Sequence, residues 1–114
     1  MLYTCIRKQL LEIAQNNKLS YNYNLICFNL ENENGCRLSV IFIIGGKYSF
    51  IIEINGHKKY LDGLSDYFTL FLLSNLMYNL NDHSFADALK GMCHSHEEIQ
   101  KIIRELKNNE NSTN

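Results

Sequence analysis

Apolar and polar residues alternate between residues 21 and 61 in the pattern of β-strands. Three turns that contain glycine interrupt the alternation, at residues 33–35, 45–47 and 55–56. Successive side chains of a strand point to opposite faces of a sheet, and turns of two or three residues join neighbouring antiparallel strands. This segment therefore predicts a four-stranded antiparallel meander.

The hydrophobic pattern also predicts how the strands pair. A three-residue loop at residues 45–47 places Phe42 opposite Phe50, and the apolar residues of both strands then share one face. The Asn-Gly pair that follows suits a type I′ turn of two residues, which places Glu53 opposite Lys58. We expect the shared apolar face to form the core of the domain.

The opposite face of the predicted sheet is also apolar at its centre, whereas Ile26 and Ile44 fall on the first face. A sheet that contacts water on one side carries polar residues there. We therefore expect the second face to be covered, either by the chain's own C-terminal helices or by a second molecule. Its apolar residues are a candidate surface for a partner or for dimer formation: Leu25, Ile41, Ile43, Ile51 and Tyr60.

Helical periodicity occurs on both sides of the meander. Residues 2–17 carry an apolar stripe with a spacing of three and four residues. After Gly63, residues 65–80 predict a helix that is capped by Ser65 and is apolar nearly all round. Such a helix is normally covered on both sides.

Two further helices follow in the prediction. Residues 83–90 form a short helix that ends at Gly91, because glycine often terminates helices. Ser95 and Glu98 have the spacing of a capping box at the start of a last helix. The polar residues 108–114 predict a disordered tail.

These elements predict a single α+β domain over residues 1–107. It has an N-terminal helix, a four-stranded antiparallel meander and three C-terminal helices packed on the sheet. The chain has 114 residues, of which 46% are hydrophobic and 20% charged, so it is long enough to bury a core without metal or disulfides. Its four cysteines form no Cys-x-x-Cys pair and are expected to be free thiols.

The N-terminal residues predict the compartment. The first eight residues lack the order of charged and apolar residues that a signal peptide has, and the longest apolar helix is too short to span a bilayer. We therefore expect a cytoplasmic protein that does not insert into a membrane. The chain contains no Pro or Trp and is rich in Asn, Ile and Lys. This bias is expected of an AT-rich gene, such as those of phages and other mobile elements.

Charge is unevenly divided along the chain. Residues 1–60 contain seven Lys or Arg and four Asp or Glu, whereas residues 61–114 contain four and eight. Acidic residues at helix starts have a local role, because they complement the helix dipole. The alternative is an acidic rim that attracts a basic partner, formed by Asp62, Asp66, Asp82, Asp87, Glu97 and Glu98.

One segment contains residues of the types that bind zinc. These are Cys93, His94 and His96, with His83 upstream, but no second pair completes a tetrahedral site. Cys93 beside a histidine is also a candidate nucleophile, although no oxyanion site is recognisable. The tyrosines of the sheet lack a flanking cluster of Lys and Arg that would indicate nucleic-acid binding. We expect no metal, no cofactor, no catalytic residue and no nucleic-acid partner.

These features favour a small binding protein of the inhibitor type and not an enzyme. We expect it to neutralise another protein, of basic charge, by occluding its surface. A toxin-immunity protein or a phage-encoded anti-defence protein would act in this way. One alternative is a homodimeric, chaperone-like adaptor, and the other is a protein that sequesters a small ligand.

Overall fold

The computed structural model describes residues 2–112 and confirms the α+β class. An antiparallel sheet of five strands follows the N-terminal helix and precedes two C-terminal helices, whereas the sequence predicted four strands and three such helices. In chain order the elements are α1 (Tyr3–Asn16), β1 (Ser20–Tyr23), β2 (Cys27–Glu31), β3 (Arg37–Ile43), β4 (Lys47–Ile54), β5 (His57–Leu64), α2 (Asp66–Asn79) and α3 (Phe85–Ser112).

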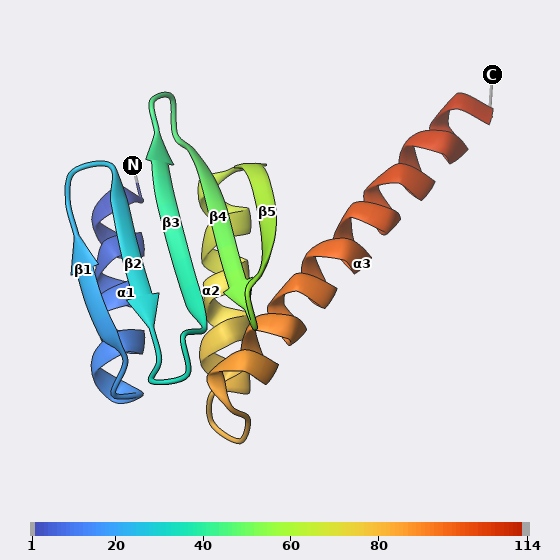
Figure 1. Ribbon diagram of the computed structural model, residues 1–114. Helices are drawn as coiled ribbons and strands as arrows, with labels where there is room; N and C mark the ends of the chain where they lie inside the picture. The colour runs from blue at the N-terminus through green and yellow to red at the C-terminus, as the bar shows by residue number, and fades with distance from the viewer. Residues whose placement is uncertain (1, 113–114) are drawn as a thin grey trace.

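The sheet is a meander with the helices on one side. Its strands lie in the order β1-β2-β3-β4-β5, and all neighbours are antiparallel. In Figure 1, α1 lies behind β1 and β2, and α2 lies behind β4 and β5. The first part of α3 packs beside α2, and the rest extends away from the sheet. The described residues thus form two layers, with the helices on one face of the sheet only.

Strand β1 corrects the predicted strand count. It is an edge strand in which Tyr21 pairs with Leu30 and Tyr23 pairs with Phe28. Both tyrosine rings stack on Phe28, with ring centroids 6.1 and 5.2 Å away. The strand has four residues, which is too short for its alternation to stand out from the preceding loop.

The turn between β4 and β5 has the predicted form. Asn55 and Gly56 have φ angles of 52° and 80°, and a type I′ turn requires positive φ at both positions. Glu53 accordingly lies opposite Lys58. The register then shifts near the end of β5, where Gly63 has a φ of 67°.

The loop between β3 and β4 lies one residue earlier than predicted. It consists of residues 44–46, and both of its glycines have positive φ. Phe42 therefore pairs with Tyr48 and not with Phe50. Because the pairing shifts by two residues, the strand residues keep their predicted faces. Ile44 leaves the core face and becomes fully exposed.

The last two helices of the prediction are a single helix, α3. Ser84 caps it, and its Oγ accepts a hydrogen bond from the backbone N–H of Asp87 at 3.2 Å. The helix then continues through Gly91. Ser95, which predicted a second helix start, instead accepts a hydrogen bond from the side chain of Asn75 on α2 at 3.0 Å. The segment 108–112, expected to be part of a disordered tail, forms the end of α3, and the last two residues of that expected tail lie outside the described residues.

Gly91 allows α3 to approach α2 closely. A Cβ at this position would lie 3.0 Å from Nδ2 of Asn79. That amide also donates a hydrogen bond to Oδ1 of Asn75 at 3.1 Å, so it is not free to move without cost. Packing against α2 therefore explains the glycine, which does not end the helix.

The variant Gly91→Ala tests this contact. Alanine favours a helix over glycine by about 1 kcal/mol, but here the displacement of Asn79 should cancel the gain. In an Asn79→Ala background the contact is absent, and Gly91→Ala should then raise the free energy of unfolding by about 1 kcal/mol. Urea denaturation of the four proteins measures this difference. An equal effect in both backgrounds would show that Asn79 does not require the glycine.

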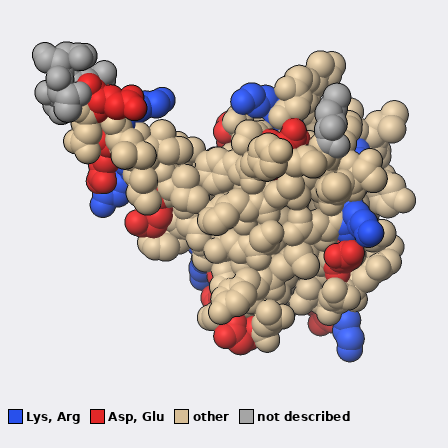
Figure 2. Space-filling model, turned by 180° about the vertical axis from the view of Figure 1, so that it is seen from behind, with Lys and Arg blue, Asp and Glu red and all other residues tan. Residues whose placement is uncertain are grey.

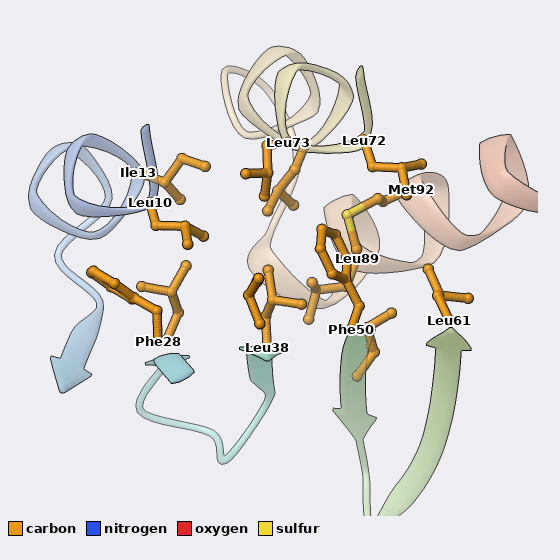
Figure 3. Close-up of a cluster of buried hydrophobic side chains, with 14 of the residues drawn as sticks. Leu10, Ile13, Phe28, Leu38, Phe50, Leu61, Leu72, Leu73, Leu89 and Met92 are labelled. Carbon is orange, nitrogen blue, oxygen red and sulfur yellow. The ribbon is translucent and has the colours of Figure 1, made fainter. Parts of the chain in front are cut away.

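The core lies between the sheet and the three helices, as Figure 3 shows. Phe50 is completely buried near its centre, and Leu89 of α3 lies over it. The first apolar face of the predicted sheet is therefore the core face. The other large residues of the core that are completely or almost completely buried include Ile6, Leu10 and Ile13 of α1, Leu72, Leu73 and Leu76 of α2, and Leu30, Leu38, Ile52, Leu61 and Leu64 of the sheet.

Candidate functional site

The second face of the sheet, which the sequence predicted as a contact surface, is open. It looks toward the viewer in Figure 1, and no described helix crosses it. The side chains of Ile43 and Tyr60 are 45% and 57% exposed, while Ile41 and Ile51 are half-buried by their neighbours in the sheet. The sequence left open whether the chain's own C-terminal helices or a second molecule covers this face. In the structure, the described C-terminal helices do not cover it.

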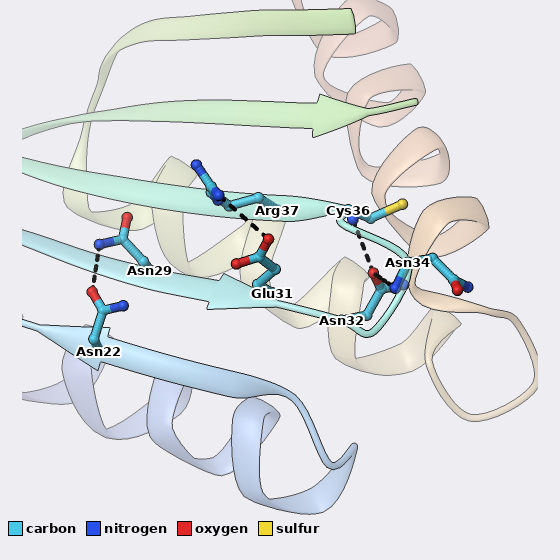
Figure 4. Close-up of polar contacts among 7 residues, drawn as sticks. All are labelled: Asn22, Asn29, Glu31, Asn32, Asn34, Cys36 and Arg37. Carbon is cyan, nitrogen blue, oxygen red and sulfur yellow. Dashed lines mark hydrogen bonds and ion pairs between the residues drawn. The ribbon is translucent and has the colours of Figure 1, made fainter. Parts of the chain in front are cut away.

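The part of this face over β1 and β2 is polar. Asn29 donates a side-chain hydrogen bond to Asn22 at 2.8 Å, and Arg37 pairs with Glu31 at 3.3 Å (Figure 4). The turn after β2 is held by the side-chain oxygen of Asn32, which accepts two backbone N–H bonds. These groups bind one another, so the apolar part of the open face is limited to β3, β4 and β5.

A second apolar surface, here called the apolar end, lies where the β1–β2 and β3–β4 connections meet the same end of the sheet (Figure 1). It comprises Leu25, Ile26, Ile43 and Ile44. The carboxamide oxygen of Asn24 accepts the backbone N–H of Ile26 at 2.9 Å, and Arg7 donates to the carbonyl of Leu25 at 2.8 Å. Leu25 is nevertheless 86% exposed.

Sequence reasoning found only half of the apolar end. It placed Leu25 and Ile43 on the candidate surface but assigned Ile26 and Ile44 to the core face. Both assignments failed because these two residues lie in connections and not in strands. A loop shifted by one residue was enough to move Ile44 from a strand into a turn.

A cleft of about 480 Å³ opens at the apolar end. Its aromatic wall is formed by Tyr3, Phe42 and Tyr48, with neighbouring ring centroids 5.1 and 5.7 Å apart. The hydroxyl of Tyr48 donates a hydrogen bond to Oδ1 of Asp66 at 2.5 Å. Burial raises the pKa of Tyr48, and the bond to Asp66 raises it further. The phenol therefore remains a hydrogen-bond donor.

The second half of α3 extends beyond the domain (Figure 1). Near the middle of the helix, the ring of His96 stacks on Phe68 with centroids 5.4 Å apart, and Glu97 pairs with Lys59 of β5. Beyond these contacts, all side chains of residues 101–110 are exposed. We call residues 97–112 the projecting half of α3. It carries a stripe of four apolar residues: Ile99, Ile102, Ile103 and Leu106.

This stripe continues the buried face of the first half of α3. Ile99 follows the buried Met92 by seven residues, and Leu106 follows Ile99 by seven. Seven residues make about two helical turns, so these side chains lie on the same side of the helix. The sequence predicted that the stripe packs on the sheet. Instead, Ile102 and Leu106 are 52% and 58% exposed.

The outer face of α2 is also partly apolar. Tyr67 and Tyr78 are largely exposed, and Phe71 lies between them along the helix. Figure 2 views the helical side of the molecule, where charged side chains lie mainly at the margins of the body and along α3. The predicted covering of α2 on both sides is therefore only half correct, because α1, α3 and the sheet leave this outer face open.

The acidic residues of the predicted rim are spread over the domain. Asp62 and Asp66 lie where β5 ends and α2 begins. Asp82 and Asp87 lie beyond the other end of α2, a helix of 14 residues and about 21 Å. The two glutamates lie near the middle of α3. The six residues thus fall into three pairs along the chain, and the two aspartate pairs lie about one helix length apart.

Three of these acids have a nearby basic group. Asp82 lies 2.7 Å from Nδ1 of His83, and Glu98 lies 4.0 Å from Nε2 of His94. The Lys59 ammonium donates a hydrogen bond to Glu97 and lowers the pKa of that carboxyl. Of the three contacts, the one between Glu97 and Lys59 is an ion pair with a permanently charged partner, and a role of these acids in partner binding stays a separate hypothesis.

The segment around Cys93 does not assemble as the zinc pattern would require. The structure places no three or more His, Cys, Asp or Glu side chains of the described residues close enough to hold a metal. Cys93 is buried in the interior of α3 and not at a helix start, and burial raises the pKa of its thiol. A thiol in such surroundings is a poor nucleophile.

The pH dependence of stability tests the packing of His96. Burial lowers the pKa of this imidazole, the positive charge of Lys59 lowers it further, and Glu97 opposes the shift. An unfolded histidine has a pKa of about 6.5, so the unfolded chain takes up a proton at a higher pH than the folded one. Stability should therefore be fully retained above about pH 6.5 and decrease as the pH falls toward the folded pKa.

The variant His96→Gln should lose this slope between about pH 7 and pH 5, as measured by urea denaturation. The matched control is His94→Gln, because His94 is exposed on the same helix. It should keep the slope of the unchanged protein. A slope that disappears in the control instead would contradict the assignment to His96.

Comparison with known proteins gives no family for this chain. Neither protein-family models, nor curated proteins, nor solved structures yield a match. Among the described helices, none combines the length and the apolar character needed to cross a membrane. The candidate site is therefore defined by geometry: the open sheet face, the apolar end with its cleft, and the projecting half of α3.

Proposed function

We propose that this protein is a binding protein that occludes the surface of another protein, with the projecting half of α3 as its main contact element. The observation that carries the proposal is the apolar stripe on a helix that leaves the body of the domain. Contiguous exposed apolar residues mark interaction sites more often than chance. An amphipathic helix that enters a groove is a common mode of protein recognition.

The dimensions of the projecting half suit this mode. Its 16 residues span about 24 Å, and Ile99, Ile102 and Leu106 with their neighbour Ile103 have the spacing of helix anchors. The four side chains are at most about half exposed, so their full burial would contribute about 3–6 kcal/mol before ordering costs are subtracted. Micromolar binding corresponds to about 8 kcal/mol, so the stripe would supply part of the affinity and other contacts the rest.

We further propose that the partner is a basic protein, such as a toxin or a defence effector. The excess of acidic residues in the second half of the chain supports this choice, because opposite charges accelerate association. The composition expected of an AT-rich gene supports a toxin-immunity or phage anti-defence role. Such a role requires binding and no catalytic group.

A homodimeric adaptor is the second candidate. It is favoured by one specific observation: the chain carries both an uncovered helix stripe and an uncovered apolar sheet face. Helix on sheet is the packing that already builds its core. In a symmetric dimer, each projecting half would cover the open face of the other copy.

Photo-cross-linking tests both candidates. A benzoylphenylalanine at position 102 should cross-link to a single protein in cells that contain the native partner. The same group at position 104, on the opposite side of the helix, is the matched control and should react little. Cross-links to a second copy of the chain would favour the dimer. Equal reaction at both positions would contradict a specific contact through the stripe.

A further inference from the structure

The cleft at the apolar end combines an apolar wall with one charged side chain among the described residues that line it. Aromatic rings of Tyr3, Phe42 and Tyr48 form one part of the wall, and Ile26 and Ile43 extend it toward solvent. Its volume of about 480 Å³ lies within the range of small-molecule sites, about 300–1,000 Å³. Such sites are mostly apolar, with a few polar groups that orient the ligand.

Asp66 is the charged residue among those that line the cleft. It is the first residue of α2, after the capping Ser65. Oδ1 accepts the Tyr48 hydroxyl, while Oδ2 faces the glycine loop, 3.9 Å from where a Cβ of Gly46 would lie. No nitrogen of a described Lys or Arg lies within 4.0 Å of this carboxylate.

Arg7, the cationic side chain that contacts the aromatic wall, does not neutralise Asp66. Its guanidinium carbon lies 4.1 Å from the centre of the Phe42 ring, and its Nη2 donates to the carbonyl of Leu25. The arginine thus covers one face of Phe42 and is held there. Among the described residues, the Asp66 carboxylate therefore has no Lys or Arg nitrogen as an ion-pair partner.

We propose that this cleft binds a small ligand that carries a protonated amine on an aromatic or branched apolar group. The ammonium pairs with Oδ2 of Asp66, and the apolar group lies against Tyr3, Phe42 and Ile43. Gly45 and Gly46 have no side chain that would fill the approach to the carboxylate. A charged hydrogen bond of this kind is stronger than a neutral one. The site does not use α3 and is independent of the proposed protein contact.

Tryptamine is a suitable probe, because the chain contains no Trp and the indole fluorescence of the probe reports binding directly. Tryptamine should bind saturably, with a Kd of about 1 mM or lower. Its neutral analogue tryptophol, which has a hydroxyl in place of the amine, should bind at least about tenfold more weakly. N-acetyl-lysine methylamide carries its amine on an unbranched chain and should not displace tryptamine. Displacement at similar concentrations would contradict the proposed need for an aromatic or branched group and would indicate a lysine side chain of a protein as the occupant.

Two variants locate the binding. Asp66→Asn keeps an oxygen that can accept the Tyr48 hydroxyl but removes the charge, so it should weaken tryptamine binding at least about tenfold and leave tryptophol unchanged. The matched control is Asp62→Asn, which removes an exposed carboxylate outside the cleft. It should change neither probe. Ile43→Ser should weaken both probes equally, because it removes apolar wall.

Three results would overturn the proposal. They are equal affinity of the unchanged protein for tryptamine and tryptophol, an Asp66→Asn variant that binds tryptamine as tightly as before, and the lack of any saturable tryptamine binding. Circular dichroism of each variant confirms that it is folded. Substitutions in the projecting half of α3 should leave tryptamine binding unchanged, so this test and that of the protein contact fail separately.

Discussion

Replacing Phe50 by alanine is expected to lower the free energy of unfolding by about 3–5 kcal/mol. The ring is completely buried between the sheet and the helices, where Leu89 of α3 lies over it (Figure 3). The loss combines the transfer free energy of the ring with the cavity that it leaves. A domain of this size has about 5–15 kcal/mol of stability in total. One kcal/mol corresponds to about 4 °C in melting temperature, so the variant should melt at least about 12 °C lower. Urea denaturation and calorimetry measure both quantities.

Tyr60→Ala is the matched control for this variant. Tyr60 lies on the adjacent strand but on the open face of the sheet, where it is 57% exposed. Its removal should cost about 1 kcal/mol or less, because little buried contact is lost. A cost as large as that of Phe50→Ala would show that the second face is also a core, and the one-sided arrangement of the helices would then be wrong.

The double variant Ile102→Asp/Ile103→Asp is expected to weaken partner binding at least about 100-fold. Anchor residues at the centre of an interface each contribute about 2 kcal/mol or more, and 1.4 kcal/mol corresponds to a factor of ten in affinity. Both residues lie on the projecting half of α3, where the structure shows them exposed. Stability should therefore change by about 1 kcal/mol or less. Isothermal titration calorimetry with the purified partner that was identified by cross-linking measures the affinity.

Sedimentation velocity of the same double variant tests the homodimer hypothesis. If the unchanged protein is a dimer, the aspartates should convert it to a monomer of unchanged stability. The control is Lys101→Ser/Arg104→Ser, which alters the same exposed segment away from the stripe. Loss of binding in the control together with retained binding in the aspartate variant would show that charge, and not the apolar stripe, makes the contact.

The sequence predicted the features that depend on local pattern. The alternation of apolar and polar residues with a period of two placed strand residues such as Val40 and Phe42 on the core face. Asn55 with Gly56 predicted a turn that the backbone angles confirm. Ser65 was recognised as a helix cap, and its Oγ does accept the N–H of Phe68. In each case a few adjacent residues contain all the information needed.

The errors arose where a distant contact decides between local alternatives. Gly91 and Ser95 carry a stop and a start signal, yet α3 continues because Asn79 and Asn75 of α2 give both residues another role. Likewise, an apolar stripe predicts a helix face but not what covers it, so the exposure of Leu106 lies outside what periodicity can show. The cleft depends on Tyr3 and Asp66, which lie far apart in the sequence.

The continuity of α3 also makes it a lever arm. The buried face around Leu89 and Met92 determines the angle at which the helix leaves the domain. The projecting half is about 24 Å long, so a tilt of about 10° at its base moves its tip by about 4 Å. Conservative core substitutions such as Met92→Leu could therefore redirect the helix without unfolding the domain. Such a core substitution would shift the position of a partner bound to the projecting half of α3, although the substituted residue does not contact that partner.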